Sequence, residues 1–192
     1  DSTQRSGFDP REQYSRLDDG SLDPREFTID RYNHRFGKAA LEDYALFYNM
    51  GYDLENGFNV YSFGSYSERE GNSGGFYRRA KDSRNVLELY PNGFLPQIAT
   101  DVKDYSLALG LQGDSGDWTW DVSTNYGRND FGLGVVNSLN TSLGTNSQTE
   151  FDNGAMVYDQ FLVNFDANTS VDFGLPDDVF FTIGAEYRRE SY

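Results

Sequence analysis

The fold is decided by residues 161–188, which read FLVNFDANTSVDF (161–173), GLPDD (174–178) and VFFTIGAEYR (179–188). From Phe161 to Phe173 every second side chain is apolar or small, and the side chains between them are mostly Asn, Asp and Ser. The run after the Gly-Leu-Pro-Asp-Asp turn alternates in the same way. A period of two is typical of a strand with one apolar and one polar face, so this stretch predicts an antiparallel hairpin.

The same pattern occurs twice more in the chain. Two further turns, at 55–57 and 113–117, each separate two alternating runs. The first of these turns contains the hairpin signal Asn-Gly. The sequence therefore predicts an all-β chain with about six strands in three hairpins. These strands are 43–54, 58–69, 103–112, 118–127, 161–173 and 179–188.

The phase of the strand 58–69 is open. Tyr61 and Phe63 compete for its apolar face with Phe58, Val60 and Tyr66. Alternation alone does not decide which set lies on that face.

The connections alternate in length. The three short turns contrast with long connections at 70–101 and 129–159, and long loops usually have a function. Residues 1–40, which contain Asp-Pro-Arg-Glu twice, are expected to form another long loop region, and 41–192 a partial barrel. Short turns on one rim and long loops on the other are typical of an outer-membrane β-barrel.

Composition removes several classes of function. The chain has 16 Lys and Arg against 31 Asp and Glu, a formal charge of −15, which disfavours nucleic-acid binding. It has no Cys and one His, so thiolate and imidazole-rich metal sites are not expected, and no cofactor is predicted. No constellation of nucleophile, base and orienting group suggests an enzyme. No apolar run reaches the length of a membrane-crossing helix.

Aromatic side chains favour a membrane barrel over a soluble one. They occur near both ends of the apolar faces, as expected for two interfacial girdles. Trp118 and Tyr126 are eight strand residues apart, about 20 Å along the membrane normal for a tilted strand. The polar faces carry many charges, which suit a wet or protein-filled lumen. A soluble β-sandwich with one face in water stays open as an alternative.

Several longer motifs make the chain resemble the barrel region of a TonB-dependent outer-membrane receptor of Gram-negative bacteria. They are RYNHRFG (31–37), LFYNMG (46–51), YSFGSY (61–66), GFYRR (75–79), YPNGFLPQI (90–98), GDWTWDVSTNYGRN (116–129), VNSLNTSLG (136–144) and GAEYRRE (184–190). The resemblance runs from about Arg5 to the end of the chain.

This resemblance implies an antiparallel up-and-down transmembrane β-barrel segment, located in the outer membrane. Family members have about 22 strands around an N-terminal plug, and they import scarce nutrients such as ferric siderophores, cobalamin or glycans. The implied partners are outer-membrane lipid and lipopolysaccharide, the plug, and through the plug the TonB complex. The sequence contains no recognisable plug, TonB box or terminal aromatic strand, so we expect it to be a fragment of such a barrel. A passive porin-like channel segment is the other membrane alternative.

The loop 74–98 is the best candidate for contact with a small-molecule substrate. Its aromatic and cationic side chains Tyr77, Arg78, Arg79 and Tyr90 combine stacking faces with concentrated positive charge. Pairing of the arginines with nearby carboxylates or lipopolysaccharide phosphates is the competing interpretation. His34 and the acidic cluster Asp18, Asp19 and Asp23 are expected to be solvated or structural loop residues, and no metal site is predicted.

Overall fold

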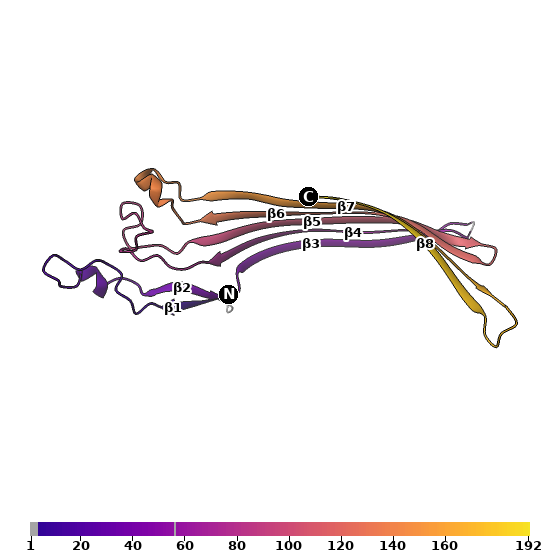
Figure 1. Cartoon of the computed structure of the whole chain (residues 1–192), viewed down its shortest axis with the longest axis horizontal. Helices are drawn as coiled ribbons and strands as arrows, with labels where there is room; N and C mark the ends of the chain where they lie inside the picture. The colour runs from indigo at the N-terminus through magenta and orange to yellow at the C-terminus, as the bar shows by residue number, and fades with distance from the viewer. Residues whose placement is uncertain (1–3, 56) are drawn as a thin grey trace. The chain divides into compact units, whose positions relative to one another are not determined.

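The computed structural model describes residues 4–55 and 57–192. Six long strands form one antiparallel sheet, in the order in which they occur along the chain (Figure 1). The strands are β3 (Ala40–Asp53), β4 (Asn59–Gly74), β5 (Gln97–Ser115), β6 (Trp118–Val136), β7 (Phe151–Val171) and β8 (Val179–Ser191). The predicted all-β fold is confirmed. The described residues do not close into a barrel, and β3 and β8 are the two edge strands of the sheet.

Short connections join the strands in pairs. The predicted turn 55–57 includes Asn56, which lies outside the described residues; beside it, the Leu54 amide donates to the Phe58 carbonyl oxygen at 2.7 Å. Only Gly116 and Asp117 separate β5 from β6, so this turn is tighter than the predicted 113–117. Gly116 has a φ of 63°, in the left-handed region that a tight turn favours and glycine adopts easily.

The register of β7 and β8 separates their two faces. Val163 lies opposite Tyr187 and Ala167 opposite Ile183, whereas Asn164 lies opposite Glu186. Because directly opposed residues of an antiparallel pair point to the same face, one face of this hairpin is apolar and the other polar. We call the side of the sheet that carries Val163 and Ile183 the apolar face and the opposite side the polar face.

The structure settles the phase of β4. The Tyr61 hydroxyl donates to Asp121 Oδ1 at 3.0 Å, and its ring stacks beside that of Phe63 with centroids 6.4 Å apart. A Cβ added at Gly110 would overlap the Tyr61 ring, so the tyrosine occupies the space over that glycine. Gly110 and Asp121 are on the polar face, and Tyr61 and Phe63 therefore lie on the polar face as well.

The strands are longer than predicted, and the long connections are shorter. β4 runs to Gly74 and β7 begins at Phe151, so the connections are 75–96 and 137–150 instead of 70–101 and 129–159. The side-chain alternation ends before the backbone ladder does, because the ladder needs only paired amides and carbonyls. Polar pairs lie near the ends of the predicted strands. Lys103 Nζ lies 3.1 Å from Glu68 Oε1, and Asn129 Nδ2 donates to Asp104 Oδ1 at 2.7 Å.

The first 40 residues contain structure that the sequence did not predict. β1 (Gln4–Phe8) and β2 (Tyr32–Gly37) pair as a separate two-stranded antiparallel sheet, and a 3₁₀ helix, η1 (Pro24–Phe27), lies between them in sequence. The predicted boundary near residue 40 falls at the start of β3. A second 3₁₀ segment, η2 (Thr141–Asn146), lies in the connection between β6 and β7. None of the helices formed by the described residues has the length and hydropathy needed to cross a membrane.

The chain forms two compact units. The first comprises residues 1–42, 69–101 and 132–155, and contains β1, β2 and the two longer connections. The second comprises 43–68, 102–131 and 156–192, and contains the short turns. The candidate site lies within the first unit.

Candidate functional site

A buried carboxylate organises the segment between β1 and β2. Glu26 Oε1 accepts the backbone amides of Gln13 at 2.6 Å and Tyr14 at 2.7 Å, and Oε2 accepts Arg31 Nη2 at 2.5 Å. Both Glu26 and Gln13 are buried. Because an ionised carboxylate can accept several hydrogen bonds, this one side chain fixes two distant stretches of an otherwise irregular segment.

An Asp-x-Arg clamp occurs three times in the loops of the first unit. In each, the aspartate carboxylate accepts three hydrogen bonds from the arginine two residues later: one from its backbone amide, one from Nε and one from Nη2. Arg11 holds the pKa of Asp9 far below its usual range, and Arg84 lowers the pKa of Asp82 to about 2. The clamps are Asp9–Arg11, Asp23–Arg25 and Asp82–Arg84.

Two of the four predicted ligand-contact residues, Arg79 and Tyr77, donate to backbone carbonyl oxygens. Arg79 Nη1 donates to the Glu12 carbonyl oxygen at 3.1 Å, which links the loop 75–96 to that segment. The Tyr77 hydroxyl donates to the Asn92 carbonyl oxygen at 2.6 Å, and burial raises the pKa of Tyr77. These two side chains therefore support the fold of the loop.

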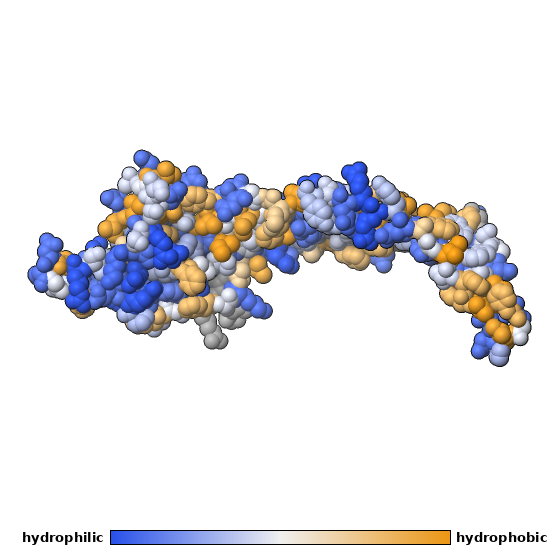
Figure 2. All heavy atoms as spheres, in the orientation of Figure 1, coloured by the Kyte–Doolittle hydropathy of each residue, from blue (hydrophilic) through white to orange (hydrophobic). Residues whose placement is uncertain are grey.

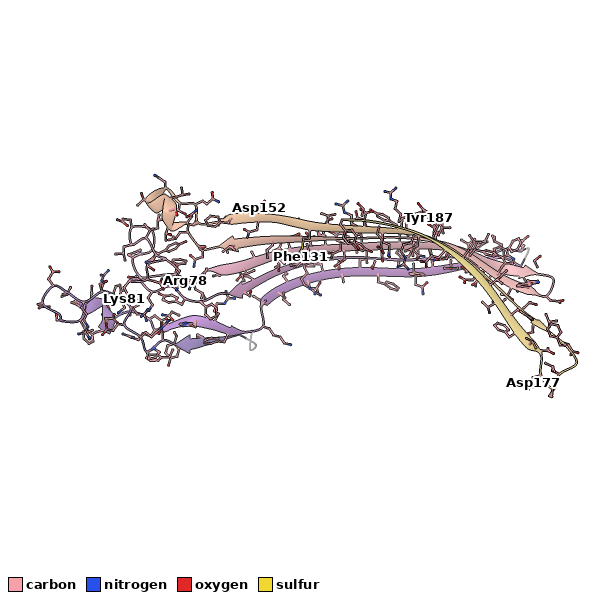
Figure 3. All side chains as sticks on the ribbon, in the orientation of Figure 1. Arg78, Lys81, Phe131, Asp152, Asp177 and Tyr187 are labelled. Atoms are coloured by element: carbon pink, nitrogen blue, oxygen red, sulfur yellow. The ribbon has the colours of Figure 1, made fainter. Side chains whose placement is uncertain are left out.

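The other two lie toward the connection 137–150. The Tyr90 ring stacks on Phe94 with centroids 4.5 Å apart, its hydroxyl donates to the Ser138 carbonyl oxygen at 3.2 Å, and burial raises its pKa. Arg78 pairs with Phe94 through both backbone amides, at 2.7 and 2.8 Å. Tyr90 thus holds one loop against the other, and Arg78 belongs to the same loop as Tyr90 (Figure 3).

Of the four predicted residues, Arg78 lines a cavity of about 490 Å³ between these loops. Its other walls include a second cation, two rings and two side-chain amides: Arg84, Phe94, Phe151, Asn140 and Asn153. Arg84 is paired with Asp82 at 3.0 Å, and the charge of Arg78 also lowers the pKa of that carboxyl. This arrangement suits reversible binding of a polar or anionic group against an aromatic wall.

Sequence reasoning missed most of the walls of this cavity. Phe94 belongs to the YPNGFLPQI motif, whose Pro and Gly signal a turn, so its place in a loop could be read from the sequence. Phe151 and Asn153 open β7, and their approach to Arg78 depends on where that strand begins.

A larger cavity, of about 870 Å³, has the opposite electrostatic character. Its lining includes five carboxylates: Glu42, Glu70, Asp101, Glu150 and Asp152. It contains no Lys or Arg, so it disfavours anions.

The remaining loop candidates have structural partners. Asp19 accepts the backbone amide and hydroxyl of Ser21 at 2.9 and 2.5 Å, and Asp23 caps η1. His34 Nδ1 lies 2.7 Å from Asn33 Oδ1. No group of three or more His, Asp or Glu side chains suited to holding a metal ion occurs among the residues that the structure describes.

Comparison with known proteins gives no relative for this chain: no protein-family model, curated protein sequence or solved structure matches it.

Proposed function

We propose that the chain is part of the barrel wall of a TonB-dependent receptor in the outer membrane of a Gram-negative bacterium. In this proposal the strands form a section of the wall, the polar face lines the lumen, and the loops of the first unit meet the substrate. The receptor takes up a scarce nutrient, such as a ferric siderophore, cobalamin or a glycan, by active transport.

The observation that carries the proposal is the uncovered apolar face of the second unit. Leu107, Leu109 and Ile183 are 51%, 50% and 56% exposed, and Val163 is 38% exposed. Burying a side chain of this size contributes about 1.5–3 kcal/mol, so leaving many of them in water is costly. Hydrocarbon tails would cover them without a second protein layer.

The exposure is as large on the edge strand β3. Large apolar or aromatic side chains occur at successive even positions of β3, from Tyr44 to Tyr52, and each is more than one third exposed. Figure 2 shows hydrophobic side chains at the surface around the end of the β7–β8 hairpin, where Phe173 and Phe181 lie. A soluble sandwich would bury such residues against a second sheet, and the six-stranded sheet has no second sheet of comparable size among the described residues.

The polar face supports the same proposal. It carries Asp104, Asp121, Asp166 and Glu186, together with the Tyr61 hydroxyl that is bonded to Asp121. Charged groups at this density need water or hydrogen-bonding protein around them, as a lumen filled by a plug provides. The plug and, through it, the TonB complex are the protein partners in this proposal.

Paired cysteine variants test the proposal, because the chain has no cysteine of its own. Leu109→Cys places a thiol on the apolar face, and Ser106→Cys places one on the polar face of the same strand. Each is labelled with an environment-sensitive fluorophore, and the full chain is folded into phosphatidylcholine vesicles. The label at position 109 should emit at shorter wavelength and be quenched by brominated lipid acyl chains, and the label at 106 should not.

Two results would contradict the proposal. One is a chain that stays soluble and folded without detergent or lipid, with both labels in water. The other is equal quenching at positions 106 and 109, because a wall segment has only one lipid-facing side.

A further inference from the structure

Four rings lie on one face of the β1–β2 sheet; three of them are exposed and the fourth, His34, is half-buried. We call Phe8, Tyr32, His34 and Phe36 the aromatic ladder. Tyr32, His34 and Phe36 are alternate residues of β2, so they point to the same side, and Phe8 lies opposite Tyr32 on β1. Phe8, Tyr32 and Phe36 are 57%, 62% and 58% exposed.

The rings are arranged in a row. The centroids of Phe8 and Tyr32 are 5.6 Å apart, and those of His34 and Phe36 are 5.7 Å apart with planes only 10° from parallel. Tyr77, from the loop 75–96, adds a fifth ring 5.9 Å from His34. A Cβ at Gly7 would overlap the Phe36 ring, so the glycine allows that ring to lie flat across the hairpin. The packing of neighbouring loops thus holds a set of flat, accessible surfaces.

The chemistry of the aromatic ladder restricts what it can bind. None of its four members is aliphatic, as a lipid or a protein core would be expected to require, and the register sets Arg5 of β1 opposite Phe36. The rings offer apolar faces, and the tips of Tyr32 and His34 offer hydrogen-bonding groups at their edges. His34 Nδ1 lies 2.7 Å from Asn33 Oδ1, and Nε2 is its other hydrogen-bonding atom.

We propose that the aromatic ladder binds a neutral oligosaccharide. A pyranose has an apolar face of C–H groups and an edge of hydroxyls, which matches rings with polar tips. Successive sugar units can stack on successive rings. The chain has a formal charge of −15, so charge complementarity favours a neutral glycan over an anionic one. This site is independent of the proposed transport function, because binding to the hairpin requires neither a closed barrel nor a plug.

The test is binding of the full chain, in detergent, to an array of neutral gluco-, manno-, galacto- and xylo-oligosaccharides with acidic glycans beside them. We expect at least one neutral oligosaccharide to bind and the acidic ones to bind less. Isothermal titration with the best neutral oligosaccharide then measures the affinity of the variants. Failure of every neutral oligosaccharide to bind would overturn the proposal.

Substitution of one ring distinguishes stacking from general hydrophobic contact. Phe36→Leu keeps apolar volume but removes the flat face, so it should weaken oligosaccharide binding about tenfold or more. Phe36→Tyr should retain most of the affinity. Phe27→Ala is the matched control, since Phe27 is 77% exposed but lies in η1, outside the ladder.

Three further outcomes would count against the proposal. Amide exchange of β2 is measured in the same sample, to detect a loss of binding by Phe36→Leu that comes from unfolding of the hairpin. Loss of β2 protection in the Leu and Tyr variants alike would refute stacking as the cause. Binding to phosphatidylcholine vesicles that Phe36→Leu leaves intact, without oligosaccharide binding, would identify a lipid-facing surface instead. Self-association that Phe36→Leu abolishes, again without oligosaccharide binding, would identify a contact between copies of the chain.

Discussion

Replacing Glu26 by Gln tests whether one buried carboxylate holds the N-terminal segment in place. Gln has nearly the same shape, but it keeps only one oxygen acceptor. If that oxygen continues to accept the amides of Gln13 and Tyr14, the new NH₂ group faces the Arg31 guanidinium, donor against donor. The substitution therefore removes one charge-assisted hydrogen bond and weakens two others.

The size of the effect follows from the surroundings of Arg31. Breaking a buried ion pair usually costs about 3–5 kcal/mol, because one charge is left without its partner. Arg31 keeps some compensation, since its Nη1 also donates to the carbonyl oxygens of Asp9 at 3.1 Å and Arg11 at 2.8 Å. We therefore expect a loss of about 2–3 kcal/mol in local stability, equivalent to a rise of roughly 30- to 150-fold in the opening equilibrium.

Amide hydrogen exchange measures this opening directly. Protection of the Gln13 and Tyr14 amides should fall by that factor, while the amides shared by β7 and β8 should not change. Glu12→Gln is the matched control: it is the glutamate of the first Asp-Pro-Arg-Glu repeat, but its carboxylate is on the surface, 2.5 Å from Arg16 Nη2 and 3.1 Å from Lys81 Nζ. Surface ion pairs contribute little to stability, so this variant should be almost neutral. Equal effects of the two substitutions, or unchanged protection in Glu26→Gln, would refute the reasoning.

Three other predictions concern different parts of the chain. Leu109→Arg should lower the free energy of unfolding in lipid vesicles by about 2–4 kcal/mol if Leu109 faces the bilayer midplane, and Ser106→Arg should lower it much less, as measured by urea titration. Tyr61→Phe leaves Asp121 without its 3.0 Å hydrogen-bond donor and should cost about 1 kcal/mol in the same titration; an unchanged midpoint would argue against this bond. Arg84 lowers the pKa of Asp82 from 3.8 to about 2, so the Asp82 contribution to stability is complete above pH 3.8 and is lost as the pH falls toward 2. The protection of the amides in residues 75–96, relative to their intrinsic exchange rates, should therefore fall over that range, and Asp82→Asn should reduce this dependence.

The sequence was sufficient for the faces of most strands. In β7 and β8 the alternation is strong, and the register pairs Val163 with Tyr187 and Asn164 with Glu186, as the pattern requires. A shift by one residue would exchange the two faces completely, so a regular pattern leaves little freedom in the pairing.

The ends of the strands were harder to predict, for a physical reason. The backbone ladder continues wherever amides and carbonyls can pair, and it does not require apolar side chains. β4, for example, continues to Gly74 through the polar residues Glu70, Asn72 and Ser73. Alternation of hydropathy therefore gave the apolar part of each strand and underestimated its full length.

The candidate site was predictable only in part, because its residues come together through loop packing. Composition identified the loop with Arg78 and Tyr90, but it could not separate Arg78, which lines the cavity, from Arg79, which bonds to the Glu12 carbonyl oxygen. The β1–β2 pair could not be predicted for the same reason. Its strands are joined by an irregular segment whose fold depends on Glu26, and the position of that carboxylate has no signature in hydropathy.

The ambiguous strand β4 shows which additional cue the sequence did contain. Tyr61 lies over Gly110 of the neighbouring strand on the polar face, and Tyr48 lies over Gly64 on the apolar face, 2.7 Å from where a Cβ of Gly64 would be. In both cases the ring covers the backbone that the glycine leaves open, and its hydroxyl finds a polar partner, Asp121 or Ser62. An aromatic residue can thus lie on either face if a glycine on the next strand provides room. For strands like β4, the position of glycines across the predicted pair is therefore a better guide to the direction of a tyrosine than its hydropathy.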